Sequence, residues 1–452
     1  MVRKAGKMLL LLAAFMQPAA EAGLLAQQAG VSGAPGLLAG VSRIDITPPL
    51  EDLPKPFATI GSKIYVRTIV FQAGGRRAVL VNGDLPTIAT DVFEQLVKRI
   101  AEAANAPVEN VMLSVTHTHN AVRLDNNPKG IMLPGSAKVT AYTADLILRS
   151  VTEAVADLQP AKAGYGNGIF HLAAARMEPG QPRGSRQPAA DRTLGVFKIE
   201  RADGTPLAVL VNNGPEPVMA MRVKTEINAD VAGVMERYVE QRFGDKAVVL
   251  YTVGSPPDVV INTSGGDTVA GRGALPPGAT PADPHALMSA VGTVLGEEVI
   301  ATLNNITTSA DVRIQGMLQT LVCPGQITTP YANACSDAPG ATLPKCVFTT
   351  RDGPPQTLRF GLIQIGDVAL IHSDANILPA VWAKVKQQAP NPDKTMLVSL
   401  VFGPIHYVVD DSDYAGHSYP VTATTVKPGC AAPGFVRESL AMLNKAQSDK
   451  AR

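Results

Sequence analysis

The chain has 452 residues, of which 46% are hydrophobic and 17% are charged. Its 40 basic and 39 acidic residues almost cancel, and this composition excludes a disordered chain and argues against nucleic acid as a partner. Glycine and proline number 40 and 36, which predicts long ordered loops between the regular elements.

The N-terminus carries the pattern of a signal peptide. Arg3, Lys4 and Lys7 precede an apolar run at 8–16, and Ala20-Glu21-Ala22 follows it. The apolar run is far shorter than the roughly 20 residues that span a membrane. We therefore expect residues 1–22 to be removed. The mature chain would be secreted or periplasmic, would contain no transmembrane segment, and would keep 37 basic and 38 acidic residues.

A strand–helix–strand unit is predicted between residues 77 and 115. The apolar run 77–82 is suited to a buried strand. A helix follows, with Asp91 as its N-cap, Glu94 three residues later and apolar residues recurring on one face. The segment 110–115 is the next strand, which completes a βαβ unit.

Two more such units follow, so the sequence predicts an α/β protein. Their strand, helix and strand are expected at 207–211, 229–243 and 247–253, and at 368–371, 376–388 and 396–402. Segments 65–72 and 358–365 alternate in polarity, which is typical of antiparallel strands. The expected core is a mixed β-sheet built from βαβ units with long loops.

Polar residues follow the ends of these strands. His117 and His119 come directly after one strand, and we expect them on the same face because side chains alternate along a strand. Glu216, Asp374 and Tyr407 follow later strands and offer oxygen ligands that suit zinc or another divalent ion. Since the carboxyl ends of parallel strands meet at one edge of a sheet, these side chains are expected to converge.

Two kinds of function stay open at this point. The paired histidines are also consistent with two polar side chains that cap a loop. The sequence contains no GxSxG elbow, no HExxH motif and no glycine-rich phosphate loop after a strand. Metal-assisted hydrolysis and ligand binding remain.

The four cysteines predict disulfides. Cys323, Cys335, Cys346 and Cys430 form no CxxC pair, which disfavours a structural zinc site. In an exported protein two disulfides are expected, and three pairings are possible. Three of the cysteines lie in the proline- and glycine-rich segment 322–356, which predicts a stapled loop rather than a core element.

Five short motifs occur in order along the chain: GVSRIDITP at 40–48, SVTHTH at 114–119, INAD at 227–230, IGDVAL at 365–370 and IHY at 405–407. In this order they resemble motifs of the N-terminal, catalytic-type domain of the neutral/alkaline non-lysosomal ceramidase family, over roughly residues 38–425. The resemblance implies a single large domain at 38–452, divergent and lacking the family's C-terminal domain.

The family cleaves the amide of N-acylsphingosine with zinc, so the resemblance implies roles for individual residues. His117 and Tyr407 take the places of metal ligands, and His119 that of the substrate-facing histidine. Arg176 and Tyr419 take the places of residues that contact the substrate.

The chain departs from the family at three of its site positions. Glu216 stands where the family has a histidine ligand, and Asn376 where it has a glutamate, although Asp374 could substitute for it. Val260 stands where the family has its serine. A metal-activated water is the route that remains, with His119 or Asp258 moving the proton.

The expected function is a secreted, metal-dependent hydrolase. It would cleave an amide or ester bond of a lipid-like or other acyl substrate. The metal would be Zn²⁺ or another divalent ion, held by His117, Glu216, Asn376 and Tyr407. The alternatives are a catalytically inactive relative that binds a ligand at the same site, and a different hydrolytic chemistry on the same scaffold.

Overall fold

The computed structural model describes residues 36–127, 134–175, 191–256, 259–261, 283–329, 348–399, 403–415 and 418–451. They fall within one compact unit, 35–452. The expected signal peptide, Arg176 and Asp258 lie outside the described residues.

The larger sheet has eight strands in the order β11-β9-β8-β6-β1-β3-β4-β5. Their bounds are β1 Leu38–Asp45, β3 Tyr65–Ala73, β4 Arg76–Gly83, β5 Val111–Val115, β6 Gln159–Ile169, β8 Thr193–Arg201, β9 Pro206–Asn213 and β11 Val248–Val253. The pairs β4–β5 and β9–β11 are parallel and the other neighbours antiparallel, so the predicted mixed sheet is confirmed.

A second sheet has four strands in the order β13-β14-β15-β17. They are β13 Ile314–Thr329, β14 Thr349–Ile365, β15 Val368–Ser373 and β17 Thr395–Ser399. The pair β15–β17 is parallel. Side chains from both sheets share one apolar core, in which Phe71, Phe197 and Leu250 of the larger sheet meet Ile363 and Leu370 of the smaller one. This shared core fixes the second sheet against the first.

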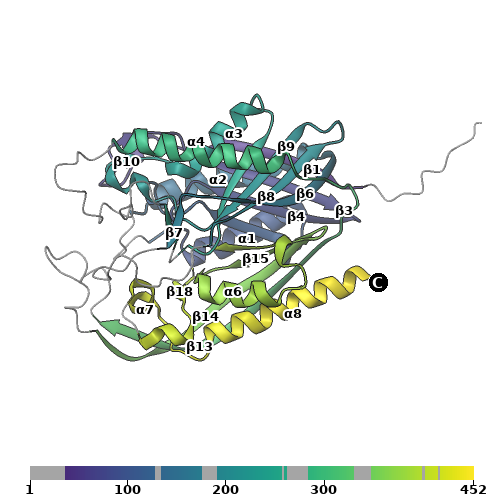
Figure 1. Ribbon diagram of the computed structural model, residues 1–452. Helices are drawn as coiled ribbons and strands as arrows, with labels where there is room; N and C mark the ends of the chain where they lie inside the picture. Colours follow the sequence, from purple (N-terminus) through teal and green to yellow (C-terminus); the bar gives the residue numbers. More distant parts are fainter. Residues whose placement is uncertain are drawn as a thin grey trace, which may run out of the picture. The chain divides into compact units, whose positions relative to one another are not determined.

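Helices cover the outer faces of both sheets (Figure 1). Helices α1 (Thr90–Ala104) and α2 (Ala137–Ala156) pack in one core with β3, β4 and β5. Helices α3 (Asp230–Arg242) and α4 (Pro284–Leu303) pack on β9 and β11. Helices α6 (Pro379–Gln388) and α8 (Ala431–Ala451) cover the smaller sheet.

Short elements complete the described chain. The two-residue or three-residue strands pair as β2 (Thr59–Ile60) with β10 (Glu226–Ile227), β7 (Ala173–Ala175) with β12 (Val259–Ile261), and β16 (Asn376–Ile377) with β18 (Tyr407–Val408). Single turns of helix are η1 Leu50–Asp52, η2 Val108–Asn110, η3 Met219–Arg222, η6 Pro392–Lys394, η7 Asp411–Ala415 and α7 Tyr419–Ala423.

Two glycines let α3 and α4 lie in close contact. A Cβ at Gly292 would lie 2.5 Å from the Cβ of Val234, and one at Gly296 would lie 2.5 Å from Cδ1 of Tyr238. Both glycines sit one turn apart on the same face of α4, as do their two partners on α3. Helix α4 has the length and apolarity of a membrane-spanning helix, but its buried residues face this α3 core.

The structure corrects two local predictions. Asp91 is not the N-cap of α1: the cap is Ala89, whose extended backbone precedes the first helical residue, Thr90. Asp91 instead lies in the first turn, where its charge favours the helix dipole. The segment 322–356 is not simply a stapled loop, because its ends belong to the long β13–β14 hairpin.

One disulfide joins Cys323 in β13 to Cys430 beside α8, across 107 residues of sequence. It ties the last helix to the edge strand of the smaller sheet. Cys335 and Cys346 lie outside the described residues, so the expected second bridge stays a prediction.

Candidate functional site

His117 and His119 lie in the loop that leaves β5, at the carboxyl end of the parallel pair β4–β5. The chain is held close to the end of β4, because the amides of Thr116 and His117 donate to the carbonyls of Gly83 and Leu85. His117 has a φ of 63°, a left-handed conformation that a non-glycine residue adopts at a cost. The side chains therefore converge through this turn and not, as predicted, through strand alternation, since β5 ends at Val115.

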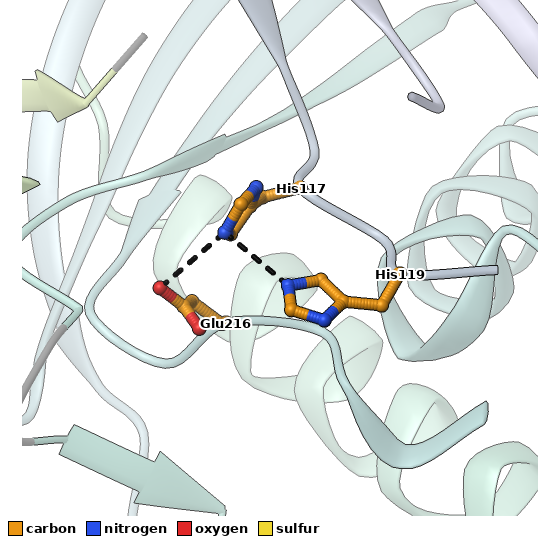
Figure 2. A group of neighbouring side chains, drawn as sticks. All are labelled: His117, His119 and Glu216. Carbon is orange, nitrogen blue, oxygen red and sulfur yellow. Dashed lines mark hydrogen bonds and ion pairs between the residues drawn. The ribbon is translucent and has the colours of Figure 1, made fainter. Parts of the chain in front are cut away.

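Three side chains form a group that could hold a metal ion. Nε2 of His117 lies 3.3 Å from Nε2 of His119 and 3.6 Å from Oε1 of Glu216 (Figure 2). One ligand atom from each residue lies within 4.8 Å of the others. The imidazole rings are almost perpendicular, at 83°, which lets both point their Nε2 atoms to the same place.

The backbone selects the tautomer of His117. Its Nδ1 contacts the carbonyl oxygen of Pro86, which can only accept a hydrogen bond, so Nδ1 carries the proton. The Nε2 lone pair of neutral His117 is then directed at His119 and Glu216. Metal-binding histidines in proteins are commonly oriented in this way by a carbonyl on the other ring nitrogen.

Glu216 comes from the loop that follows β9, so the parallel pair β9–β11 brings it to the site. The Tyr251 hydroxyl of β11 donates to the carbonyl of Pro215 at 2.7 Å. The carboxylate of Asp230, at the start of α3, accepts from the amide of Ala220 in the same loop. The INAD motif includes Asp230, but nothing in the sequence singles out Tyr251.

The expected ligands Asn376 and Tyr407 lie opposite each other on the parallel strands β16 and β18. Asn376 is buried, and its Oδ1 accepts no hydrogen bond from the described residues. The Tyr419 ring lies 5.9 Å from the Tyr407 ring, at an angle of 80°. The structure thus brings Asn376, Tyr407 and Tyr419 together as a second group.

Two buried serine hydroxyls connect the end of β11 in the larger sheet with β16 and β17. The Ser255 hydroxyl, just beyond β11, donates to the carbonyl of Ile377 at 2.5 Å. The Ser399 hydroxyl at the end of β17 donates to the carbonyl of Gly254 at 2.7 Å. These buried bonds hold the strand ends of both sheets at one edge.

Asp374, the expected substitute for Asn376, has a partner in β14. Its Oδ1 accepts from the amide of Arg359 at 3.0 Å, and its Oδ2 lies 3.5 Å from the guanidinium of the same residue. Burial raises the pKa of Asp374 to about 7, against the lowering effect of Arg359. The carboxyl group of Asp374 is therefore engaged by Arg359 within the smaller sheet.

Comparison with known proteins identifies the fold. No family model matches the chain, and no curated protein matches it. Among solved structures, the neutral ceramidase from Pseudomonas aeruginosa matches with a TM-score of 0.68 and 18% identity, over 91% of this chain and 75% of that chain. A ceramidase complexed with C2 matches with a TM-score of 0.68 and 17% identity, over 92% and 76% of the two chains. The chain therefore has the fold of the neutral ceramidases, as the order of its motifs predicted.

Proposed function

We propose that this chain is a metal-dependent hydrolase that cleaves an amide or ester bond of a lipid-like acyl substrate. The observation that carries the proposal is the convergence of His117, His119 and Glu216 at the strand ends of a ceramidase fold. Export of the chain is part of the proposal and rests on the sequence of residues 1–22.

The three residue types fit a divalent ion in chemistry, and two of their three separations fit its ligand spacing, while the third, between His119 and Glu216, is within 4.8 Å. Ligands at roughly 2.0–2.2 Å from a tetrahedral ion lie about 3.3–3.6 Å from one another. The two separations measured from Nε2 of His117 are 3.3 Å and 3.6 Å. Two imidazoles and one carboxylate, with a fourth position left for water or substrate, is a common composition of catalytic zinc sites.

In this proposal His119 is a ligand and not only a substrate-facing residue. While no ion is bound, neutral His117 accepts at Nε2, so Nε2 of His119 donates that hydrogen bond. A bound ion would need the Nε2 lone pair of His119, so the neutral ring would then carry its proton on Nδ1.

A divalent metal at this position would polarise the carbonyl of the substrate and lower the pKa of a bound water. The chain's own residues would hold and orient the reactants. Asn376 and Tyr407, predicted from the sequence as ligands, are here proposed instead to line the substrate side together with Tyr419, and Asn376 offers its unused Oδ1 as an acceptor. Arg176 and Asp258 stay predictions for substrate contact and proton transfer.

The proposal is tested on protein purified without a histidine tag. We expect one equivalent of bound divalent metal, hydrolysis of N-acyl amides or esters that chelation abolishes, and loss of both in His117→Ala. His285→Ala is the control, because this half-exposed histidine pairs with Glu226 outside the group of three. Absence of metal from the wild-type protein after incubation with Zn²⁺, Mn²⁺ and Co²⁺ would overturn the metal site.

A second candidate function is supported by the valine at 260. The resemblance places the family's serine there, and valine has no hydroxyl that could act on the substrate. A catalytically silent protein that binds an acyl ligand would keep the metal but hydrolyse none of the amides or esters. Metal content and turnover, measured on the same sample, separate the two functions.

A further inference from the structure

We propose that Asp230 and Tyr251 are positioning residues, which hold Glu216 at a fixed distance from His117 and His119. This inference rests on the proposed function, in which Glu216 is a metal ligand. Neither residue belongs to the group of three.

Hydrogen bonds fix the Glu216 loop both before and after Glu216 in the chain. On one side, the Tyr251 hydroxyl donates to the carbonyl of Pro215. On the other side, Oδ2 of Asp230 accepts from the amide of Ala220 at 2.6 Å, and the Met219 amide also donates to this carboxylate. Glu216 thus lies between two anchors that both come from the α3–β11 unit.

The same turn that carries Asp230 also holds the histidine loop. The Thr118 hydroxyl donates to the carbonyl of Asn228 at 2.8 Å. In return, the amide of Asn228 donates to the carbonyl of Asn120 at 2.7 Å. His119 lies between Thr118 and Asn120, so its backbone is bound to the turn on both sides. The turn 228–230 therefore connects the two loops that supply the three proposed ligands.

The strained conformation of Asp230 indicates that its surroundings hold the turn in place. Asp230 has a φ of 57° and is 1% exposed, although a left-handed backbone is costly for a residue with a side chain. Its amide donates to Oδ1 of Asn228, and the amide of Ala229 donates to the hydroxyl of Ser62. The following helix is packed against α4 and β11, which makes the turn a rigid base.

Both anchors are present at neutral pH. Burial raises the pKa of Asp230 to about 6, so the carboxylate is ionised at pH 7 and accepts strongly from amides. Burial also raises the pKa of Tyr251, so its hydroxyl stays protonated and can donate. Outer residues that orient metal ligands typically change metal affinity by about 10- to 100-fold when mutated.

The experiment compares Zn²⁺ affinity in four proteins: wild type, Asp230→Asn, Tyr251→Phe and the control Met235→Ala. Met235 is buried in α3 and leaves both loops' hydrogen bonds intact, so its variant measures loss of helix packing alone. We expect Zn²⁺ to bind about 10- to 100-fold more weakly to Asp230→Asn and Tyr251→Phe, and within two-fold of wild type to Met235→Ala. Hydrogen exchange of the segment 215–223 is measured in parallel on the metal-free proteins.

The outcomes separate this inference from the proposed function. If wild type binds no Zn²⁺, the metal site is overturned, and faster exchange of 215–223 in Asp230→Asn still decides whether Asp230 holds the loop. If wild type binds and both variants bind equally well, the positioning roles are overturned. Should Asp230→Asn fail to fold, Tyr251→Phe decides, because it removes a single hydroxyl. If Met235→Ala lost as much Zn²⁺ affinity as the other two variants, the loss would reflect general destabilisation of the protein. That result would also overturn the inference.

Discussion

At the scale of single residues, the candidate site depends on one strained histidine. His117 combines a left-handed backbone with an Nδ1 contact to Pro86, and both turn its Nε2 toward Glu216. The strain is maintained because the flanking backbone is bound to β4. A motif of two histidines indicates the ligand type, but only the turn after β5 determines where the imidazoles point.

The carboxylate of Glu216 can be tested by itself. Glu216→Gln keeps the size of the side chain and removes the charge, so Zn²⁺ should bind at least 10-fold more weakly while the fold is retained. Glu200→Gln is a matched control, because the Glu200 side chain is buried to a similar extent and pairs with Lys198, outside the group of three. Calorimetric titration with Zn²⁺ measures both variants. Equal affinity of Glu216→Gln and wild type would remove Glu216 from the ligand set.

At the scale of elements, a long hairpin takes the place of the predicted stapled loop. Strands β13 and β14 pair over most of their length, and β13 is the edge strand of its sheet. Proline and glycine are tolerated here because Pro354 and Pro355 lie in the part of β14 that pairs only with β13, since β15 pairs with β14 only over 360–365. The Cys323–Cys430 disulfide then joins this edge to the start of α8.

The disulfide should contribute to stability by restricting the unfolded chain. Closing a loop of about 100 residues stabilises a protein by roughly 2–5 kcal/mol. We expect the double variant Cys323→Ala/Cys430→Ala to lose about this much free energy of unfolding, measured by urea denaturation under oxidising conditions. Mutation is preferred to a reductant, which would also act on the other cysteines. An unchanged free energy would show that α8 is held by apolar packing alone.

At the scale of the whole molecule, the two sheets enclose polar groups as well as the apolar core. His372 is 4% exposed, and neither ring nitrogen has a hydrogen-bond partner among the described residues. It lies on the face of β15 that carries Leu370 and directly over Gly361, where a Cβ would lie 2.7 Å from its Nε2. Burial lowers the pKa of His372 from 6.5 to about 4.

This histidine should make the molecule sensitive to acid. Between pH 6.5 and about 4 the unfolded chain binds a proton at His372 that the folded chain does not, so the free energy of unfolding falls as the pH falls. The loss from this group approaches about 3 kcal/mol. His372→Leu should lose about that much less between pH 7 and pH 4, measured by urea denaturation at each pH. Parallel stability curves for both proteins would contradict the assignment.

The class of fold and the residue types of the candidate site follow from the amino-acid sequence. Apolar runs and their periodicity placed β4, β5, β9, β11 and β15 close to their observed bounds, because strand burial and helix amphipathicity are local properties. The order of five motifs predicted the ceramidase fold, which the solved structures confirm. His117 and Glu216, which the structure brings together, were named from the sequence because polar residues that follow parallel strands meet at one edge of a sheet.

Which of these residues lie close together depends on the tertiary structure. The meeting of His119 with His117 and Glu216 depends on a left-handed turn and on loops from β5 and β9, which are far apart in sequence. Asp230 and Tyr251 act through hydrogen bonds to the backbone of another loop, and such bonds leave no pattern in the sequence. Contacts across the fold are set by the packing of α3 and α4 on the sheet, so local patterns could name the candidate ligands but not the residues that we propose position them.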